Sequence, residues 1–203
     1  MLLKQRLHLP LLNLTRTYAT KMSRISDVVF KDHRELQDQY KNIKAAKDAD
    51  TAIRWQNQFV WELARHSLGE EIVVYPKFKK YLGDVGEELA EKDRNEHQIV
   101  KDYLYKFQSL NPSQTEFIPT IDSLMANLQK HIEEEESQDF PQLESKLLAD
   151  ESQEMAQSFE RTKMLVPTHS HPSAPNKPPF ETVVGLLTAP LDKLQDLMKR
   201  WPQ

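Results

Sequence analysis

The chain of 203 residues contains no cysteine and only four glycines. The lack of cysteine excludes disulfides, thiolate nucleophiles and zinc fingers, so any metal site must use nitrogen and oxygen ligands. The scarcity of glycine disfavours a sheet protein, which needs many tight turns, and the abundance of Leu, Lys, Glu, Gln and Ala favours helices. We therefore expect an all-α fold.

The sequence also lacks a long apolar run and an excess of positive charge. No stretch of about 18 apolar residues occurs, so we expect no membrane insertion. The net charge of −4, with acidic residues spread along the chain, disfavours a nucleic acid or an anionic membrane surface as the main partner. The length suits one domain of about 100 to 200 residues with tails, rather than two domains.

The N-terminal segment differs in composition from the rest of the chain. It carries arginine, lysine, leucine and hydroxylated residues, and no Asp or Glu precedes Asp27. Because this composition is typical of a mitochondrial transit peptide, we expect residues 1–24 to direct the protein to the mitochondrial matrix. The stretch RTYA resembles a matrix-protease site with cleavage after Tyr18. The alternatives are a disordered basic tail, or translation from Met22 to give a cytoplasmic form.

Apolar residues at helical spacing predict four helices over 26–46, 51–75, 87–110 and 115–148. Pro76 is expected to kink or end the second helix. Because short connections make successive helices antiparallel neighbours, residues 25–148 are expected to form an up-down-up-down four-helix bundle.

Residues 149–203 differ in composition from the bundle and are expected to add a helix, a proline-rich linker and a capping helix. The first helix is predicted over Ala149 to Lys163, with Met155, Phe159 and Leu165 turned inward. The stretch PTHSHPSAPNKPP predicts an extended segment, and its two histidines lack the carboxylates and rigid support of a metal site. The last helix is predicted over residues 180–198, with a kink at proline 190.

One histidine falls on the apolar stripe of each predicted bundle helix, at His33, His66, His97 and His131. Two of them head the same pattern, HSLGEEIVVYP and HIEEEESQDFP: His, three residues, Glu-Glu, three residues, an aromatic residue and Pro. A single histidine on an apolar stripe is usually a hydrogen-bonded core residue. Four of them, two with a glutamate four residues later, indicate a shared site.

The spacing of the repeated pattern places a histidine and a carboxylate on one helix face, because positions i and i+4 are neighbours on a helix. Imidazole and carboxylate ligands without sulfur suit iron, and also zinc or manganese. A carboxylate between two ions can bridge them, so we expect two bridged ions. The predicted metal ligands are His33, His66, Glu70, His97, His131 and Glu135.

The other acidic residues of the repeated pattern are expected to face solvent, namely Glu133, Glu134 and Glu136. Glu71 is also expected to face solvent, with hydrogen bonding to a ligand histidine as the alternative. Tyr40 and Tyr103 are interpreted as packing residues.

The segments DHREL, HSLGEEIVVYP, NEHQIV and HIEEEESQDFP together resemble the hemerythrin-like, or HHE cation-binding, family, as found in fungi. The resemblance covers about Ile25 to Leu148 and implies a four-helix bundle around a non-heme di-iron site with the same six ligands. Oxygen-carrying members have a second histidine one turn from that of the third helix, where this chain has Asp93 and Lys101. The resemblance therefore does not extend to reversible oxygen carriage. Asp93, Glu62 or water are the candidates to complete the shell.

Three functions are compatible with this sequence. The first is a metal-binding protein that senses or handles iron, O2 or NO, with such a diatomic molecule as its ligand. The second is a di-iron oxidase or peroxide-consuming enzyme, which is less favoured because no flavin or nicotinamide fingerprint occurs and because ferritin-like oxidases rely on four carboxylates. The third is a metal-free adaptor, which the cost of buried charge disfavours.

Overall fold

The structure is a computed structural model that describes residues 23–173 and 180–203. The described residues form helices and no strand, as expected for an all-α fold. In chain order the elements are α1 Ile25–Ala45, α2 Ala49–Gly69, the π-helical turn η1 Glu70–Val74, α3 Tyr75–Leu82, α4 Asp84–Gln108, α5 Phe117–Glu134, the π-helical turn η2 Glu135–Asp139, α6 Phe140–Glu144, α7 Ala149–Lys163 and α8 Phe180–Asp196.

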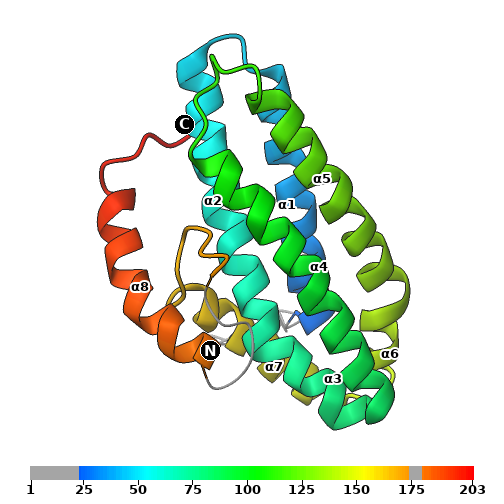
Figure 1. The fold of residues 1–203 in the computed structure, drawn as a ribbon. Helices are drawn as coiled ribbons and strands as arrows, with labels where there is room; N and C mark the ends of the chain where they lie inside the picture. Colours follow the sequence, from blue (N-terminus) through cyan, green and yellow to red (C-terminus); the bar gives the residue numbers. More distant parts are fainter. Residues whose placement is uncertain (1–22, 174–179) are drawn as a thin grey trace, which may run out of the picture.

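Four long helices, α1, α2, α4 and α5, form an antiparallel bundle (Figure 1). Each packs on the next in chain order, and α5 returns to pack on α1, which closes the ring. The connection between α1 and α2 is short, and the Asp48 side chain caps α2 by accepting a hydrogen bond from Thr51 N at 2.8 Å. Gly83, with φ of 65°, makes the turn between α3 and α4.

Both copies of the repeated pattern switch from α-helix to π-helix at their glutamates. Tyr75 N–H bonds to the carbonyl of Glu70, and Phe140 N–H bonds to that of Glu135, each five residues back. The proline after each aromatic residue has no N–H to donate, and the wider turn accommodates it. Of the two outcomes expected at Pro76, a kink or an end, the structure excludes the end, because the helix continues as α3 to Leu82 after the π-helical turn.

The core of the bundle has two apolar clusters with a polar layer between them. One cluster lies toward the α1–α2 and α4–α5 turns and includes Leu36, Phe59 and Leu104; the other, near α3, α6 and α7, includes Val29 and Phe140. On every bundle helix the predicted ligand histidine lies between residues of the two clusters. The polar layer is therefore shielded from solvent at both ends.

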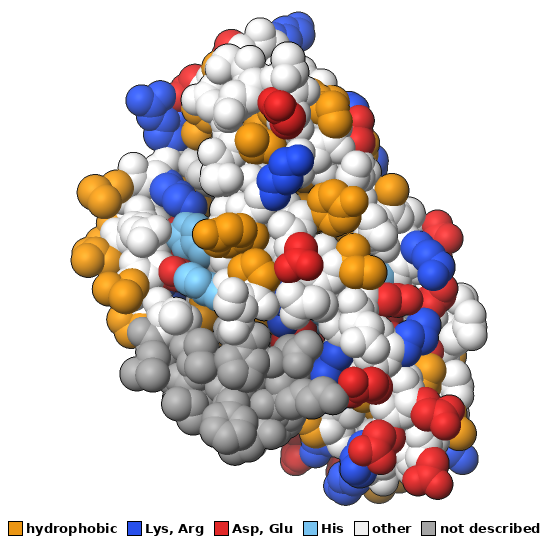
Figure 2. Space-filling model, viewed as in Figure 1, with side chains coloured by type: hydrophobic (Ala, Val, Ile, Leu, Met, Phe, Trp, Pro, Cys, Tyr) orange, Lys and Arg blue, Asp and Glu red, His pale blue; other side chains and the backbone are white. Residues whose placement is uncertain are grey.

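The C-terminal part packs on the bundle. Helix α7 covers α1, α2 and η1, and buries Met155 and Phe159 as expected. The prediction for Leu165 was wrong, because this side chain is 60% exposed. Figure 2 shows hydrophobic side chains along the edge where α8 lies. Leu191 and Leu194 of α8 are exposed, as are Leu197 and Met198 just after it. Among the described residues, no helix is both long and apolar enough to cross a membrane.

Gly86 allows α4 to approach α3 closely. A Cβ atom at this position would lie 2.0 Å from the carbonyl oxygen of Phe78, which is backbone and cannot rotate away. We expect Gly86→Ala to lower the free energy of unfolding by about 1–3 kcal/mol, because overpacking forces the two helices apart. Urea denaturation measures the change. The exposed Glu88→Ala on the same helix serves as control, and an equal effect of both substitutions would contradict the packing argument.

Candidate metal centre

All six predicted ligands meet in the polar layer, and each is at most 1% exposed. Glu70 Oε2 lies 3.3 Å from His66 Nε2 and 3.4 Å from His97 Nε2. Glu135 places Oε2 3.4 Å from His33 Nε2 and Oε1 3.3 Å from His131 Nε2. The two carboxylates therefore lie between the four imidazoles.

The histidines form two pairs, one from α1 and α2 and one from α4 and α5. The Nε2 atoms of His97 and His131 are 3.0 Å apart, and the rings of His33 and His66 have their centroids 5.0 Å apart. Glu70 has an oxygen within 4.8 Å of donor nitrogens of both pairs. Each of the two glutamates therefore has an oxygen within 3.4 Å of one histidine of either pair.

The Nδ1 atom of each histidine contacts a carboxylate from the neighbouring helix or its π-helical turn. This carboxylate lies on the side of the ring away from the centre. A histidine that donates from Nδ1 turns the Nε2 lone pair toward the centre, so this contact fixes both the tautomer and the ring orientation. The four contacts are Asp32 to His66 at 3.3 Å, Glu71 to His97 at 3.0 Å, Glu96 to His131 at 2.9 Å and Glu136 to His33 at 2.8 Å. These contacts link each bundle helix to the next in chain order, and the contact of Glu136 with His33 links the last helix to the first.

Two of these outer carboxylates were expected to face solvent. Glu71 is fully buried, so the alternative of a hydrogen bond to a ligand histidine is the correct one. The prediction for Glu136 was wrong, because it hydrogen-bonds His33 and pairs with Arg34. The Glu-Glu pair in each repeated pattern could have indicated this role. The first glutamate of each pair points to the centre, and the second contacts the histidine of the neighbouring helix.

The outer carboxylates are in turn paired with cations. The pairs are Lys163 with Asp32, Lys101 with Glu71 at 2.7 Å, Lys92 and Lys130 with Glu96 at 4.0 Å each, and Arg34 with Glu136. Lys163 lies at the end of α7 and also contacts Glu62 at 2.7 Å. Helix α7 thus contributes a buried charge to the surroundings of the centre.

The polar layer contains buried carboxylates that are not fully balanced by positively charged side chains. Among the described residues, Glu70, Glu135 and Asp93 are the carboxylates with neither oxygen hydrogen-bonded although both are buried. Burying an unpaired carboxylate costs several kcal/mol, so a bound cation would stabilise these three groups. Nitrogen and oxygen donors in this number suit iron, and also zinc or manganese.

The pKa values of the acids follow from this imbalance. Burial and the neighbouring Glu135 raise the pKa of Glu70 well above its usual range, and the same two causes raise the pKa of Asp93 to about 8. The pKa of Glu135 is lowered well below its usual range, because His131 and His33 outweigh the effect of burial.

The pKa values of the histidines differ within the second pair. Burial lowers the pKa of His97 to about 4, which keeps it in the neutral form that binds metal. Burial also acts on His131, but the carboxylates of Glu135 and Glu96 outweigh it and raise the pKa of His131 well above its usual range. The raised pKa favours the protonated form of His131, whose positive charge would balance part of the buried negative charge.

A family model described as the hemerythrin HHE cation binding domain matches residues 24–143 of this chain. The chain belongs to the hemerythrin HHE family. An uncharacterized hemerythrin-like protein of Schizosaccharomyces pombe is 68% identical over 187 residues, which span 92% of both chains. A DNA nickase of Nostoc sp. is 23% identical over 139 residues, which span 68% of this chain and 39% of that protein. No solved structure matches significantly.

In this hemerythrin-like chain, Tyr75 is a further residue of the centre that the sequence did not indicate. Its hydroxyl lies 3.1 Å from His97 Nε2, and the side chain is fully buried. Tyr75 is the aromatic residue that ends the first repeated pattern, where Phe140 ends the second. Tyr40 and Tyr103 pack against the apolar cluster, as expected.

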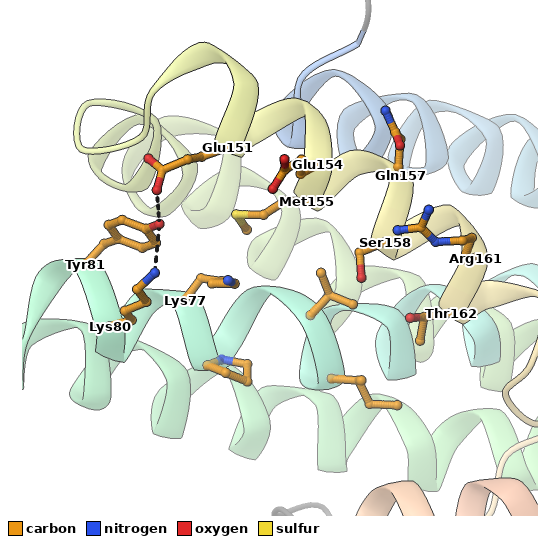
Figure 3. A pocket seen from close by; sticks show the side chains of 13 residues that line it. Lys77, Lys80, Tyr81, Glu151, Glu154, Met155, Gln157, Ser158, Arg161 and Thr162 are labelled. Atoms are coloured by element: carbon orange, nitrogen blue, oxygen red, sulfur yellow. Dashed lines mark hydrogen bonds between the residues drawn. The ribbon is translucent and has the colours of Figure 1, made fainter.

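Two other features of this hemerythrin-like chain lie apart from the centre. His171 Nε2 lies 3.0 Å from Asp192 on α8, and Asp192 also accepts hydrogen bonds from the backbone of Thr168 and His169. These contacts hold the C-terminal segment to α8. A surface pocket of about 660 Å³ lies between α3 and α7, where Tyr81 donates a hydrogen bond to Glu151 (Figure 3). Its lining contains none of the six predicted ligands.

We expect Lys163→Met to lower the free energy of unfolding by about 3–5 kcal/mol, because it leaves Asp32 buried without its cation and removes one of the two cations that pair with Glu62, the other being Arg65. Chemical denaturation measures the change. Lys31→Met removes the exposed pair with Glu35 and should change the stability by no more than about 0.5 kcal/mol. A loss below about 1 kcal/mol for Lys163→Met would show that α7 does not balance the charge of Asp32.

Proposed function

We propose that this protein binds two iron ions in the bundle and uses them to sense or handle a small diatomic molecule such as O2 or NO. The observation that carries the proposal is the convergence of four Nε2 atoms on two buried glutamates whose oxygens accept no hydrogen bond from the described residues. Iron is preferred to zinc or manganese on the implication of the family, and the donor set is compatible with all three.

Each residue has a distinct role in this proposal. The four histidines would supply neutral nitrogen ligands, and Glu70 and Glu135 would bridge the ions and balance their charge. Once bound, the ions would supply the redox chemistry. The outer carboxylates keep the Nδ1 protons in place, and the hydroxyl of Tyr75 is positioned to donate a hydrogen bond inside the centre.

A binding or sensing role is favoured over catalysis because the centre lies between two apolar clusters. Buried side chains above and below the polar layer restrict access to small molecules. Sustained consumption of O2 or peroxide by the iron-loaded protein would instead favour the enzyme.

The proposed location is the mitochondrial matrix. Residues 1–24 carry the basic, acid-free composition of a targeting segment, and residues 1–22 lie outside the described part of the chain. N-terminal sequencing of the protein from isolated mitochondria tests this, since a mature N-terminus at Ala19 supports targeting. An intact N-terminus at Met1, or one at Met22 in a cytoplasmic fraction, contradicts it.

We expect His66→Ala and Glu135→Ala each to lose at least half of the bound iron after anaerobic loading, because each removes a ligand from inside the centre. Elemental analysis gives the iron content per chain. His171→Ala is the matched control, because His171 contacts Asp192 away from the centre. Equal iron loss in all three variants, or no uptake by the unmodified protein, would contradict the proposal.

A further inference from the structure

The pocket between α3 and α7 has the size and the mixed lining of a small-molecule site. Its volume is about 660 Å³, within the range of known ligand pockets. Ile72 and Val73 of η1 and Met155 of α7 form an apolar part of its wall. Figure 3 shows labelled side chains of α3 and α7 on opposite sides of the pocket. A molecule bound there would therefore contact both helices.

Three cations line this pocket, namely Lys77, Lys80 and Arg161. The charge of Lys80 is already balanced within the protein. Lys80 Nζ donates a hydrogen bond to the Tyr81 hydroxyl at 3.1 Å, and this hydroxyl donates to Glu151 at 2.6 Å. Lys80 and Glu151 thus belong to one hydrogen-bonded chain, and their charges offset each other.

Lys77 and Arg161 differ from Lys80, because neither makes a hydrogen bond or an ion pair with a described residue. The side chain of Lys77 is nevertheless partly buried. The remaining acidic residue of the lining is Glu154, which is exposed. Two cations therefore face one carboxylate, and the pocket keeps a positive charge that the protein does not offset.

Two hydroxyl groups of α7 add to the donors of this pocket. Ser158 and Thr162 both line it, and they share one helix face because they are four residues apart. Neither hydroxyl is hydrogen-bonded to a described residue. Guanidinium, ammonium and hydroxyl groups are the donors that bind a carboxylate or a phosphate. The lining therefore combines donors for an acidic group with an apolar wall.

We propose that this pocket binds a small organic anion, whose carboxylate or phosphate is balanced by Lys77 and Arg161 and whose apolar part packs on Met155 and η1. An ion pair in a partly shielded pocket is screened less by salt than one on the open surface. The inference is independent of bound iron, because the lining contains none of the six predicted metal ligands.

Titration of the full chain, labelled with 15N and followed by NMR, tests the proposal with four probes. Hexanoate and hexyl phosphate carry an acidic group and an apolar chain, hexan-1-ol lacks the charge, and acetate lacks the chain. We expect hexanoate, hexyl phosphate or both to shift amide signals of α3 and α7. Binding should be at least about fivefold tighter than that of hexan-1-ol or acetate. The tighter of the two anions identifies the preferred acidic group.

Substitutions of single charges locate the site. Arg161→Gln and Lys77→Gln should each weaken binding at least about fivefold. Arg161 is exposed, so its replacement tests the site without disturbing a buried contact. Lys79→Gln is the matched control, because Lys79 lies on the same helix but pairs with Glu87 outside the pocket. Glu154→Gln should strengthen binding, because it removes a charge that repels the anion.

Four outcomes would overturn the inference. Equal binding of hexan-1-ol would show an apolar groove without charge recognition, and equal binding of acetate would show attraction by charge alone. Equal weakening by Lys79→Gln, or weaker binding in Glu154→Gln, would contradict an anion held by Lys77 and Arg161. Absence of any shift would show that the pocket binds no anion of this class. The proposed metal centre would stand in every case.

Discussion

The structure depends on the need to balance buried negative charge inside a helical bundle. Glu70, Glu135 and Asp93 lie in a layer closed by apolar clusters on both sides, and none of their oxygens is hydrogen-bonded among the described residues. Such groups are strongly destabilising unless a cation or a proton neutralises them. Burial raises the pKa values of Glu70 and Asp93, which favours their protonated forms, and a bound metal ion would take the place of these protons. Folding and metal binding are therefore linked.

The geometry of the centre depends on all four bundle helices, because the outer carboxylates link each helix to the histidine of the next. Every bundle helix presents a histidine and also holds the histidine of the next helix. A shift of one helix would therefore misplace two imidazoles. The two π-helical turns add to this design, because each begins at a glutamate of the centre and lets the helix continue past a proline. Helix α7, beyond the matched family region, joins the network through Lys163.

The fold and the six converging residues were predictable because they depend on local periodicity. Helical spacing placed His66 with Glu70, and His131 with Glu135, on one face, and short turns fixed the helix order. What the sequence did not reveal depends on contacts between helices. Glu133 and Glu136 are both expected to face solvent in the acidic run, yet Glu136 contacts Nδ1 of His33 and Glu133 does not. The continuation of the helix past Pro76 and the approach of Tyr75 to His97 likewise depend on π-helical geometry, which apolar spacing does not encode.

X-ray absorption at the iron edge of the anaerobically loaded protein tests the central claim most directly, since it reports the ligands and the neighbouring metal together. The account predicts nitrogen and oxygen ligation, scattering from imidazole rings, and a second iron at roughly 3.5–4 Å, the separation typical of two-metal sites. Iron with oxygen ligands alone, without imidazole and without a neighbouring iron, would contradict a shared centre built on Glu70 and Glu135.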